Sequence, residues 1–210
     1  RKVFTVDKIS VIVPCFNEED VLPLFYQEVT KVLESIENTT YELLFINDGS
    51  SDHTEDLIKL MAHKNKQCFY YSFSRNFGKE AAMYAGLENA TGDYVVIMDA
   101  DLQHPPYLLK EMYRSLKEEN YDCSAGKRID RTGEGKLRNF LSHSFYKVIQ
   151  TLTKMDMDDG AGDFRMMTRQ MVDAILELKE YNRYMKGLFS FVGFNTKWLE
   201  FHNVERQGGN

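Results

Sequence analysis

Apolar runs alternate with helix-like segments through the first half of the chain, and this alternation limits the fold more than any other feature. Four runs are predominantly apolar, as is typical of strands buried on both faces: residues 9–14, 41–47, 68–74 and 94–98. Three segments between them carry apolar residues at helical spacing: 19–37, 52–64 and 78–90. This order predicts an α/β fold with a mostly parallel sheet flanked by helices.

The second half of the chain has a less regular pattern. We expect a helix at 105–119, a fifth strand at 122–125 and a glycine-rich, charged loop at 126–135. Beyond that loop the pattern predicts these elements in order: a helix at 137–153, an acidic loop at 156–162, a strand at 164–167 and a helix at 169–180. The C-terminal part combines aromatic residues with arginine. One domain spanning residues 1–210 is expected.

The composition argues against several classes of protein. A net charge of −6 disfavours a nucleic-acid binder, which usually has a basic surface, so no nucleic-acid partner is expected. The three cysteines, Cys15, Cys68 and Cys123, are far apart and read as buried free thiols of a reducing compartment. No apolar run approaches the roughly 18 residues that cross a bilayer. Because the chain starts at Arg1 without a methionine, we expect it to be a piece of a longer protein.

Polar clusters follow each of the four predicted strands. They are Asn17-Glu18-Glu19, Asp48 to Asp52, Arg75-Asn76 and Asp99-Ala100-Asp101. In open α/β sheets, ligands bind beyond the carboxyl ends of the strands. The sequence therefore predicts a ligand site where these clusters meet.

Asp99 and Asp101 are the strongest chemical signal in these clusters. Two carboxylates separated by one residue after a buried strand can turn toward a common point, and such hard oxygen ligands suit Mg²⁺ or Mn²⁺. An ion there would neutralise a diphosphate leaving group. The alternative interpretation is that both are solvated acids in a turn. Their position directly after a buried strand argues against this alternative.

Other charged residues allow two interpretations each. Asp48 could accept a hydrogen bond from a base or a ribose hydroxyl, or it could simply belong to a turn in which Asp52 caps the next helix. Positive charge gathers around the predicted loop at Lys127, Arg128, Arg131, Lys136 and Arg138. Arginine can grip phosphate oxygens through two hydrogen bonds, although charge runs are more often solvated surfaces.

Three blocks of the sequence, in this order and spacing, resemble the inverting glycosyltransferases of family 2, which have the GT-A fold. The blocks are VIVPCFNEE, FINDGSSDHT and RNFGKEAAMYAGLENATGDYVVIMDADLQHPP. The third block is similar to the polyprenyl-phosphate branch, which includes dolichol-phosphate mannosyltransferase and bactoprenol glucosyltransferase. The resemblance implies a Rossmann-like GT-A sheet with a nucleotide-sugar half at about 1–104 and an acceptor half at about 105–210.

The resemblance also implies roles for matching residues. The nucleotide base and ribose would be held by residues of the first two blocks: Pro14, Phe16, Asn17, Glu19 and Asp48. The ribose–diphosphate part and a Mg²⁺ or Mn²⁺ ion would be held by Asp99, Asp101 and Gln103. Three further positions match residues that grip donor or acceptor phosphates: Arg128, Arg138 and Ser142. Asp163 and Arg165 match a segment near the reacting centre.

These matches imply metal-dependent, inverting transfer of a hexose from a nucleotide-diphosphate sugar to a polyprenyl phosphate. A UDP-glucose-like donor is preferred over GDP-mannose, and the expected catalytic residues are Asp101, Asp163, Arg128 and Arg138. The nearest alternative is transfer to a sugar hydroxyl in glycan synthesis, which needs a general base, with Asp163 as the candidate. A nucleotide-sugar-binding module without activity is the alternative from another class. A Rossmann-type oxidoreductase is disfavoured because no G-x-G-x-x-G follows the first strand.

The resemblance also carries an expectation about the whole protein. Chains of this branch continue past an arginine-glycine-serine-lysine stretch into membrane-associated helices, and Arg206 is placed at the start of such a stretch. We expect a parent protein anchored at the cytoplasmic face of the membrane through its C-terminal part. The aromatic C-terminal surface suggests contact with a bilayer or a homo-oligomer.

Overall fold

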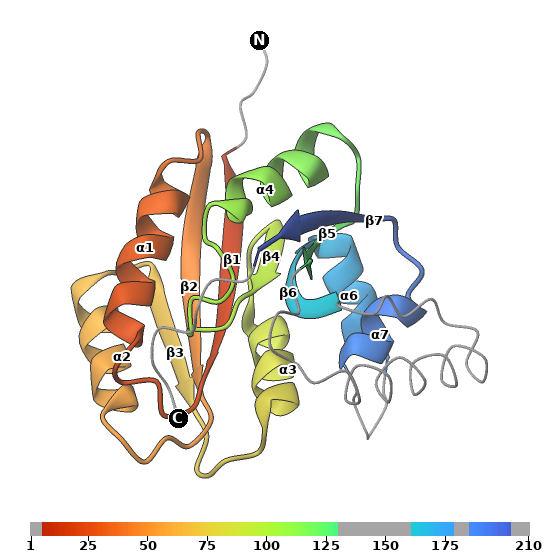
Figure 1. Ribbon diagram of the computed structural model, residues 1–210. Helices are drawn as coiled ribbons and strands as arrows, with labels where there is room; N and C mark the ends of the chain where they lie inside the picture. Colours follow the sequence, from red (N-terminus) through yellow and green to blue (C-terminus); the bar gives the residue numbers. More distant parts are fainter. Residues whose placement is uncertain (1–5, 130–160, 179–184, 203–210) are drawn as a thin grey trace.

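The computed structural model describes residues 6–129, 161–178 and 185–202, which form one seven-stranded sheet flanked by helices (Figure 1). The strands lie in the order β3 (Cys68–Ser72), β2 (Thr39–Asn47), β1 (Asp7–Cys15), β4 (Tyr94–Ile97), β6 (Ala161–Thr168), β5 (Cys123–Arg128), β7 (Thr196–Phe201). Among these strands only β6 is antiparallel to its neighbours, β4 and β5. The predicted mostly parallel α/β sheet is confirmed.

Helices cover both faces of this sheet because its strands carry apolar side chains on both sides. On one face lie α1 (Leu22–Glu34), α2 (Thr54–Lys64) and α4 (Leu108–Glu118) (Figure 1). On the other lie α3 (Lys79–Asn89), α6 (Arg169–Glu177) and α7 (Met185–Phe191). Adjacent residues of β4 show the division, since Val96 belongs to the first core and Val95 to the second. None of the helices in the described part of the chain has the length and apolar character needed to cross a bilayer.

The first four strands and three helices lie where the periodicity predicts them, with ends shifted by a few residues. The prediction at 126–135 is wrong in its first residues, because Gly126 to Arg128 continue β5. Gly126 is needed there because a Cβ atom would lie 2.8 Å from both the Phe164 and the Phe201 rings on the flanking strands. The glycine thus marks close packing in the sheet instead of a loop. The predicted helix at 137–153 lies outside the described residues.

Two elements near the C-terminus were not predicted. Helix α7 and strand β7 fall in the aromatic-rich segment, where the sequence has no clear periodicity. Strand β7 is an edge strand that pairs in parallel with β5, from Thr196 beside Cys123 to Phe201 beside Arg128. Only Leu199 and Phe201 of β7 are buried, and the strand therefore has no simple apolar run.

Candidate active site

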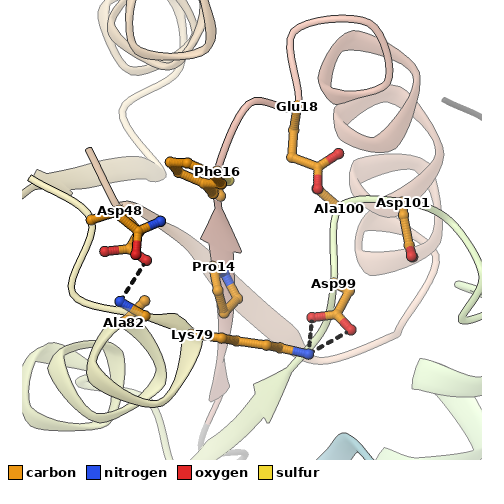
Figure 2. A pocket seen from close by; sticks show the side chains of 12 residues that line it. Pro14, Phe16, Glu18, Asp48, Lys79, Ala82, Asp99, Ala100 and Asp101 are labelled. Carbon is orange, nitrogen blue, oxygen red and sulfur yellow. Dashed lines mark hydrogen bonds and ion pairs between the residues drawn. The ribbon is translucent and has the colours of Figure 1, made fainter. Parts of the chain in front are cut away.

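A pocket of about 290 Å³ lies at the carboxyl ends of β1, β2 and β4. Its lining comes from all four predicted strand-end clusters and from the start of α3: Pro14, Cys15, Phe16, Glu18, Asp48, Asn76, Gly78, Lys79, Ala82, Asp99, Ala100 and Asp101. Figure 2 shows Asp48 on one side of the pocket and Asp99 and Asp101 on the other. Parallel strands end at the same edge of a sheet, so residues far apart in the sequence meet here.

The loop after β1 supplies the aromatic part of the pocket. The Phe16 side chain is 46% exposed although it lines the pocket, so one face of its ring is available to a ligand. Its neighbour Asn17 has a left-handed backbone (φ 55°), and its Oδ1 accepts a hydrogen bond from the Ser51 amide at 2.8 Å. Glu19 Oε2 accepts one from the His53 amide, also at 2.8 Å. Asn17 and Glu19 therefore join the loop after β1 to the loop after β2.

Asp52 strengthens the same junction between loops. Its Oδ1 accepts a hydrogen bond from the amide of Thr54, the first residue of α2, at 3.0 Å. Its Oδ2 accepts one from the Glu19 amide at 3.2 Å. Although partial burial raises the pKa of this carboxyl, the hydrogen bonds outweigh it and the pKa is lowered. The expected bond to an amide of the first turn is present, although the N-cap position of α2 is His53 and not Asp52. The same carboxylate also fixes the loop that carries Phe16.

Asp48 forms the wall opposite the Asp99–Asp101 pair. Its carboxylate is 3% exposed, and its two oxygens accept hydrogen bonds from the amides of Phe77 at 2.6 Å and Gly78 at 2.9 Å. Gly78 has φ 97°, a conformation that favours glycine, and directly precedes α3. A buried carboxylate is stable here because charge-assisted bonds replace its hydration. Asp48 thus positions the start of α3 while it lines the pocket.

Lys79, the first residue of α3, was not singled out from the sequence. Its Nζ lies 2.7 Å from Asp99 Oδ1 and 2.8 Å from Asp163 Oδ2. Burial lowers the pKa of Lys79, but the two carboxylates outweigh that effect and raise it. Asp99 and Asp163 are brought together because β4 pairs with β6 in antiparallel register, with Ile97 opposite Arg165. No spacing in the sequence reveals this contact.

The segment after β4 meets the end of β5. Asp101 Oδ1 accepts a hydrogen bond from the Gln103 amide at 3.1 Å, and Gln103 Oε1 accepts one from Arg128 Nη2 at 3.2 Å. Arg128 thus reaches the expected metal set from another strand. Arg138 and Ser142 lie outside the described residues.

The oxygen set fits a divalent ion of the Mg²⁺ or Mn²⁺ type. Asp99 and Asp101 offer carboxylate oxygens and Gln103 an amide oxygen, and a cationic side chain already contacts Asp99. Within residues 6–129, 161–178 and 185–202, no group of three or more His, Cys, Asp or Glu side chains is placed to hold a metal ion. An open set of two carboxylates and one amide suits ions that keep several water or phosphate ligands.

His104 forms part of the wall behind Asp99. Its ring stacks on Phe164 with centroids 4.8 Å apart, and its Nδ1 lies 4.0 Å from Asp99 Oδ2. Burial lowers the pKa of His104 in spite of the nearby Asp99 and Asp101 carboxylates. The imidazole is therefore neutral near neutral pH and packs as an aromatic ring against β6.

Arg165 is buried beneath the pocket and does not line it. Its Nη2 donates to the Gly162 carbonyl at 2.9 Å, and its guanidinium carbon lies 3.9 Å from the centre of the Phe189 ring. Burial lowers the pKa of this guanidinium. The contacts hold the part of β6 that carries Asp163 against α7. Arg165 therefore supports the site from behind.

Comparisons with known proteins show the family to which the chain belongs. Residues 10–176 match the sequence model of the family described as Glycosyl transferase family 2. The chain is 46% identical over 201 residues to the putative glycosyltransferase CsbB of Bacillus subtilis, a match that covers 96% of this chain and 60% of the relative. It is 39% identical over 206 residues to the prophage bactoprenol glucosyl transferase homolog of Escherichia coli, covering 96% and 65%. The chain thus spans less than two thirds of the length of these relatives.

Solved structures show the same fold at lower identity. A mannosyltransferase from Pyrobaculum calidifontis in complex with GDP-Man and Mn²⁺ superposes with a TM-score of 0.66 at 18% identity, over 95% of this chain and 57% of that one. Glucosyl-3-phosphoglycerate synthase from Mycobacterium tuberculosis, in complex with Mn²⁺, UDP-glucose and phosphoglyceric acid, gives 0.61 at 19% identity, over 97% and 73%. The chain belongs to glycosyl transferase family 2 and has the GT-A fold.

Proposed function

We propose that this chain is the catalytic part of an enzyme that transfers a hexose, preferably glucose from UDP-glucose, to a polyprenyl phosphate. The observation that carries the proposal is the pocket in which Phe16 and Asp48 face the Asp99–Asp101 pair. An aromatic ring and an acceptor on one side suit a base and ribose, and acids beside a basic residue on the other suit a metal-bound diphosphate. The bactoprenol glucosyl transferases among the relatives support the acceptor class.

The donor would lie across the carboxyl ends of the strands. In this pose Phe16 packs on the base. Asp48 accepts a hydrogen bond from the nucleoside, because each of its carboxylate oxygens has a second lone pair besides the one used by the Phe77 or Gly78 amide. Asn17 and Glu19 hold the two loops that form this half of the site. GDP-mannose remains the second donor candidate, because a structural neighbour was solved with GDP-Man.

Asp99, Asp101 and Gln103 would hold Mg²⁺ or Mn²⁺ at the diphosphate. When bound, such an ion supplies positive charge that stabilises the leaving group. Arg128 lies next to this oxygen set, because its Nη2 donates a hydrogen bond to Gln103 Oε1. Its guanidinium can bind phosphate oxygens. Arg138 and Ser142 remain predictions for further phosphate contacts.

The reaction would be a single displacement with inversion. An oxygen of the acceptor phosphate attacks the anomeric carbon on the face opposite the nucleoside diphosphate. The new carbon–oxygen bond forms as the bond to the β-phosphate oxygen breaks, and the electron pair leaves with the diphosphate. A lipid phosphate is largely anionic near neutral pH, since its second pKa is about 6, and therefore needs no general base.

Transfer to a sugar hydroxyl is the second candidate, with Asp163 as the general base. The Asp163 carboxylate contacts Lys79, which lies in the pocket and also contacts Asp99. A hydroxyl acceptor needs a proton acceptor in the transition state. Asp163 would have to exchange its contact with Lys79 for the hydroxyl of the acceptor.

A polyprenyl phosphate is a membrane lipid, so the proposed transfer takes place at a membrane surface. Nucleotide sugars are cytoplasmic metabolites, which assigns the proposed reaction to the cytoplasmic face. The chain covers only 60% and 65% of the two relatives described above, so membrane contact is proposed for the whole protein.

Thermal unfolding with a panel of nucleoside diphosphates, with and without Mn²⁺, tests the donor site. A ligand at about 100 times its Kd stabilises the folded state by about 2.7 kcal/mol. We expect a Mn²⁺-dependent rise in melting temperature with UDP that Asp101→Ala removes. Asp173→Ala, an exposed acid of α6, should retain the rise. Radiolabelled transfer from UDP-glucose to a polyprenyl phosphate then tests the reaction, and a chain that binds no nucleotide contradicts the proposal.

A further inference from the structure

Lys79 connects three elements that meet at the pocket. Its ammonium extends from the start of α3 to Asp99, which follows β4 (Figure 2). It also contacts Asp163 in β6. The distances from Nζ are 2.7 Å to Asp99 Oδ1, 2.8 Å to Asp99 Oδ2 and 2.8 Å to Asp163 Oδ2. Both oxygens of Asp99 therefore face one ammonium group.

The location of this ammonium matters because Asp99 belongs to the oxygen set that fits a divalent ion. A cation that engages both Asp99 oxygens takes up the position from which a metal ion could bind this carboxylate through both oxygens. An ammonium and a divalent ion bound to the same carboxylate would lie close together and repel each other strongly. Lys79 and a metal therefore compete for the same carboxylate.

The side chain of Lys79 is suited to exchange. It is 41% exposed and long, while Asp163, at 13%, is more enclosed. A lysine that leaves Asp99 retains a partner in Asp163, because that carboxylate is held by a different strand. The loss of one ion pair would therefore not leave the ammonium without an acceptor.

This inference rests on the proposed function. We propose that Lys79 is the cation bound to Asp99 when no donor is present. A divalent ion then displaces Lys79 from Asp99, and Lys79 keeps its contact with Asp163. Lys79 is in this sense a positioning residue. It keeps the facing carboxylates together before the donor arrives and makes the site bind a bare ion weakly. The phosphate oxygens of the donor then supply the additional ligands that favour the exchange.

The test is a titration of the chain with Mn²⁺ in the absence of nucleotide, followed by electron paramagnetic resonance of the free ion. We expect Lys79→Met to bind Mn²⁺ roughly tenfold more tightly than the unmodified chain, because the competing charge is gone. Lys79→Arg, which retains the charge, should stay close to the unmodified chain. The matched control is Lys59→Met, which removes an ammonium paired with Glu55 on α2, outside the pocket.

Equal or weaker Mn²⁺ binding by Lys79→Met, in a variant whose melting temperature shows that it is folded, would overturn the proposal. A merely structural ion pair would change the melting temperature and leave Mn²⁺ affinity unaltered. Asp101→Ala in the Lys79→Met background separates the two proposals, since it should abolish the tightened binding. If no variant binds Mn²⁺, or if Asp101→Ala has no effect, the metal site of the proposed function fails as well.

Discussion

Asp48 Oδ2 accepts a hydrogen bond from the backbone amide of Gly78 at 2.9 Å, and this contact ties the end of β2 to the start of α3. The other oxygen of the carboxylate accepts from the Phe77 amide at 2.6 Å. The same side chain lines the pocket, so one residue both shapes the site and faces its ligand.

Asp48→Asn should destabilise the fold and weaken nucleotide binding. An asparagine offers only one acceptor oxygen, so its NH₂ group would face a backbone N–H, and an unsatisfied buried group costs about 1–3 kcal/mol. Urea unfolding measures the loss in free energy, and titration with UDP and Mn²⁺ measures the affinity. Asp56→Asn, an exposed change on α2, is the control. Equal stability of the two variants would contradict the role of the two amide contacts.

Phe16→Ala should weaken nucleotide binding and leave stability nearly unchanged. Stacking of a base on an aromatic ring contributes about 1–3 kcal/mol, so the Kd for UDP should rise by roughly fivefold or more. Phe69→Ala is a matched control, because Phe69 is exposed to the same degree (47% against 46%) on β3 and does not line the pocket. Isothermal titration calorimetry distinguishes them, and equal affinities would show that Phe16 does not touch the base.

Glu42 should make stability depend on pH at the end of the sheet away from the pocket. Its carboxylate is buried and accepts hydrogen bonds from Ser10 Oγ at 2.6 Å and the Thr91 amide at 2.8 Å, and it pairs with Lys8. Burial raises the pKa of Glu42, but these partners outweigh burial and lower it below the ordinary value of 4.5.

A lowered folded-state pKa means that the stabilisation by Glu42 is complete above the unfolded value of about 4.3 and is lost as the pH falls through the folded value. Glu42→Gln should therefore cost stability at pH 7, by about 1–3 kcal/mol, and lose this difference under acid conditions. Urea unfolding between pH 7 and pH 3 measures both. Glu55→Gln, in an exposed pair with Lys59, should have a much smaller effect. A difference that persists at low pH would contradict the assignment.

Asp163→Asn distinguishes the two acceptor classes. With a polyprenyl phosphate as acceptor, we expect transfer to fall by no more than about tenfold, because proton abstraction is not required and only the contact with Lys79 changes. Donor binding, measured by UDP titration, should be retained. With a sugar hydroxyl as acceptor, a loss of transfer of about a thousandfold at unchanged donor affinity would instead support Asp163 as general base.

Local sequence pattern was enough to predict the sheet-and-helix framework and the edge of the sheet where a site forms. Buried parallel strands are continuous apolar runs, and the residues that follow them must meet at one edge, so the pocket lining by Phe16, Asp48, Asp99 and Asp101 follows from local pattern and topology. The roles of these residues with a donor came from the family resemblance, which periodicity alone does not supply.

Which charged groups face each other depends instead on the packing of distant strands. Lys79 and Asp163 lie 84 positions apart, and their contact depends on β6 running antiparallel beside β4. The extension of β5 through Gly126 likewise depends on packing between the Phe164 and Phe201 rings, although glycine and charge in this segment favour a loop. Local propensity acts over a few neighbouring residues, whereas these contacts depend on how distant strands pair.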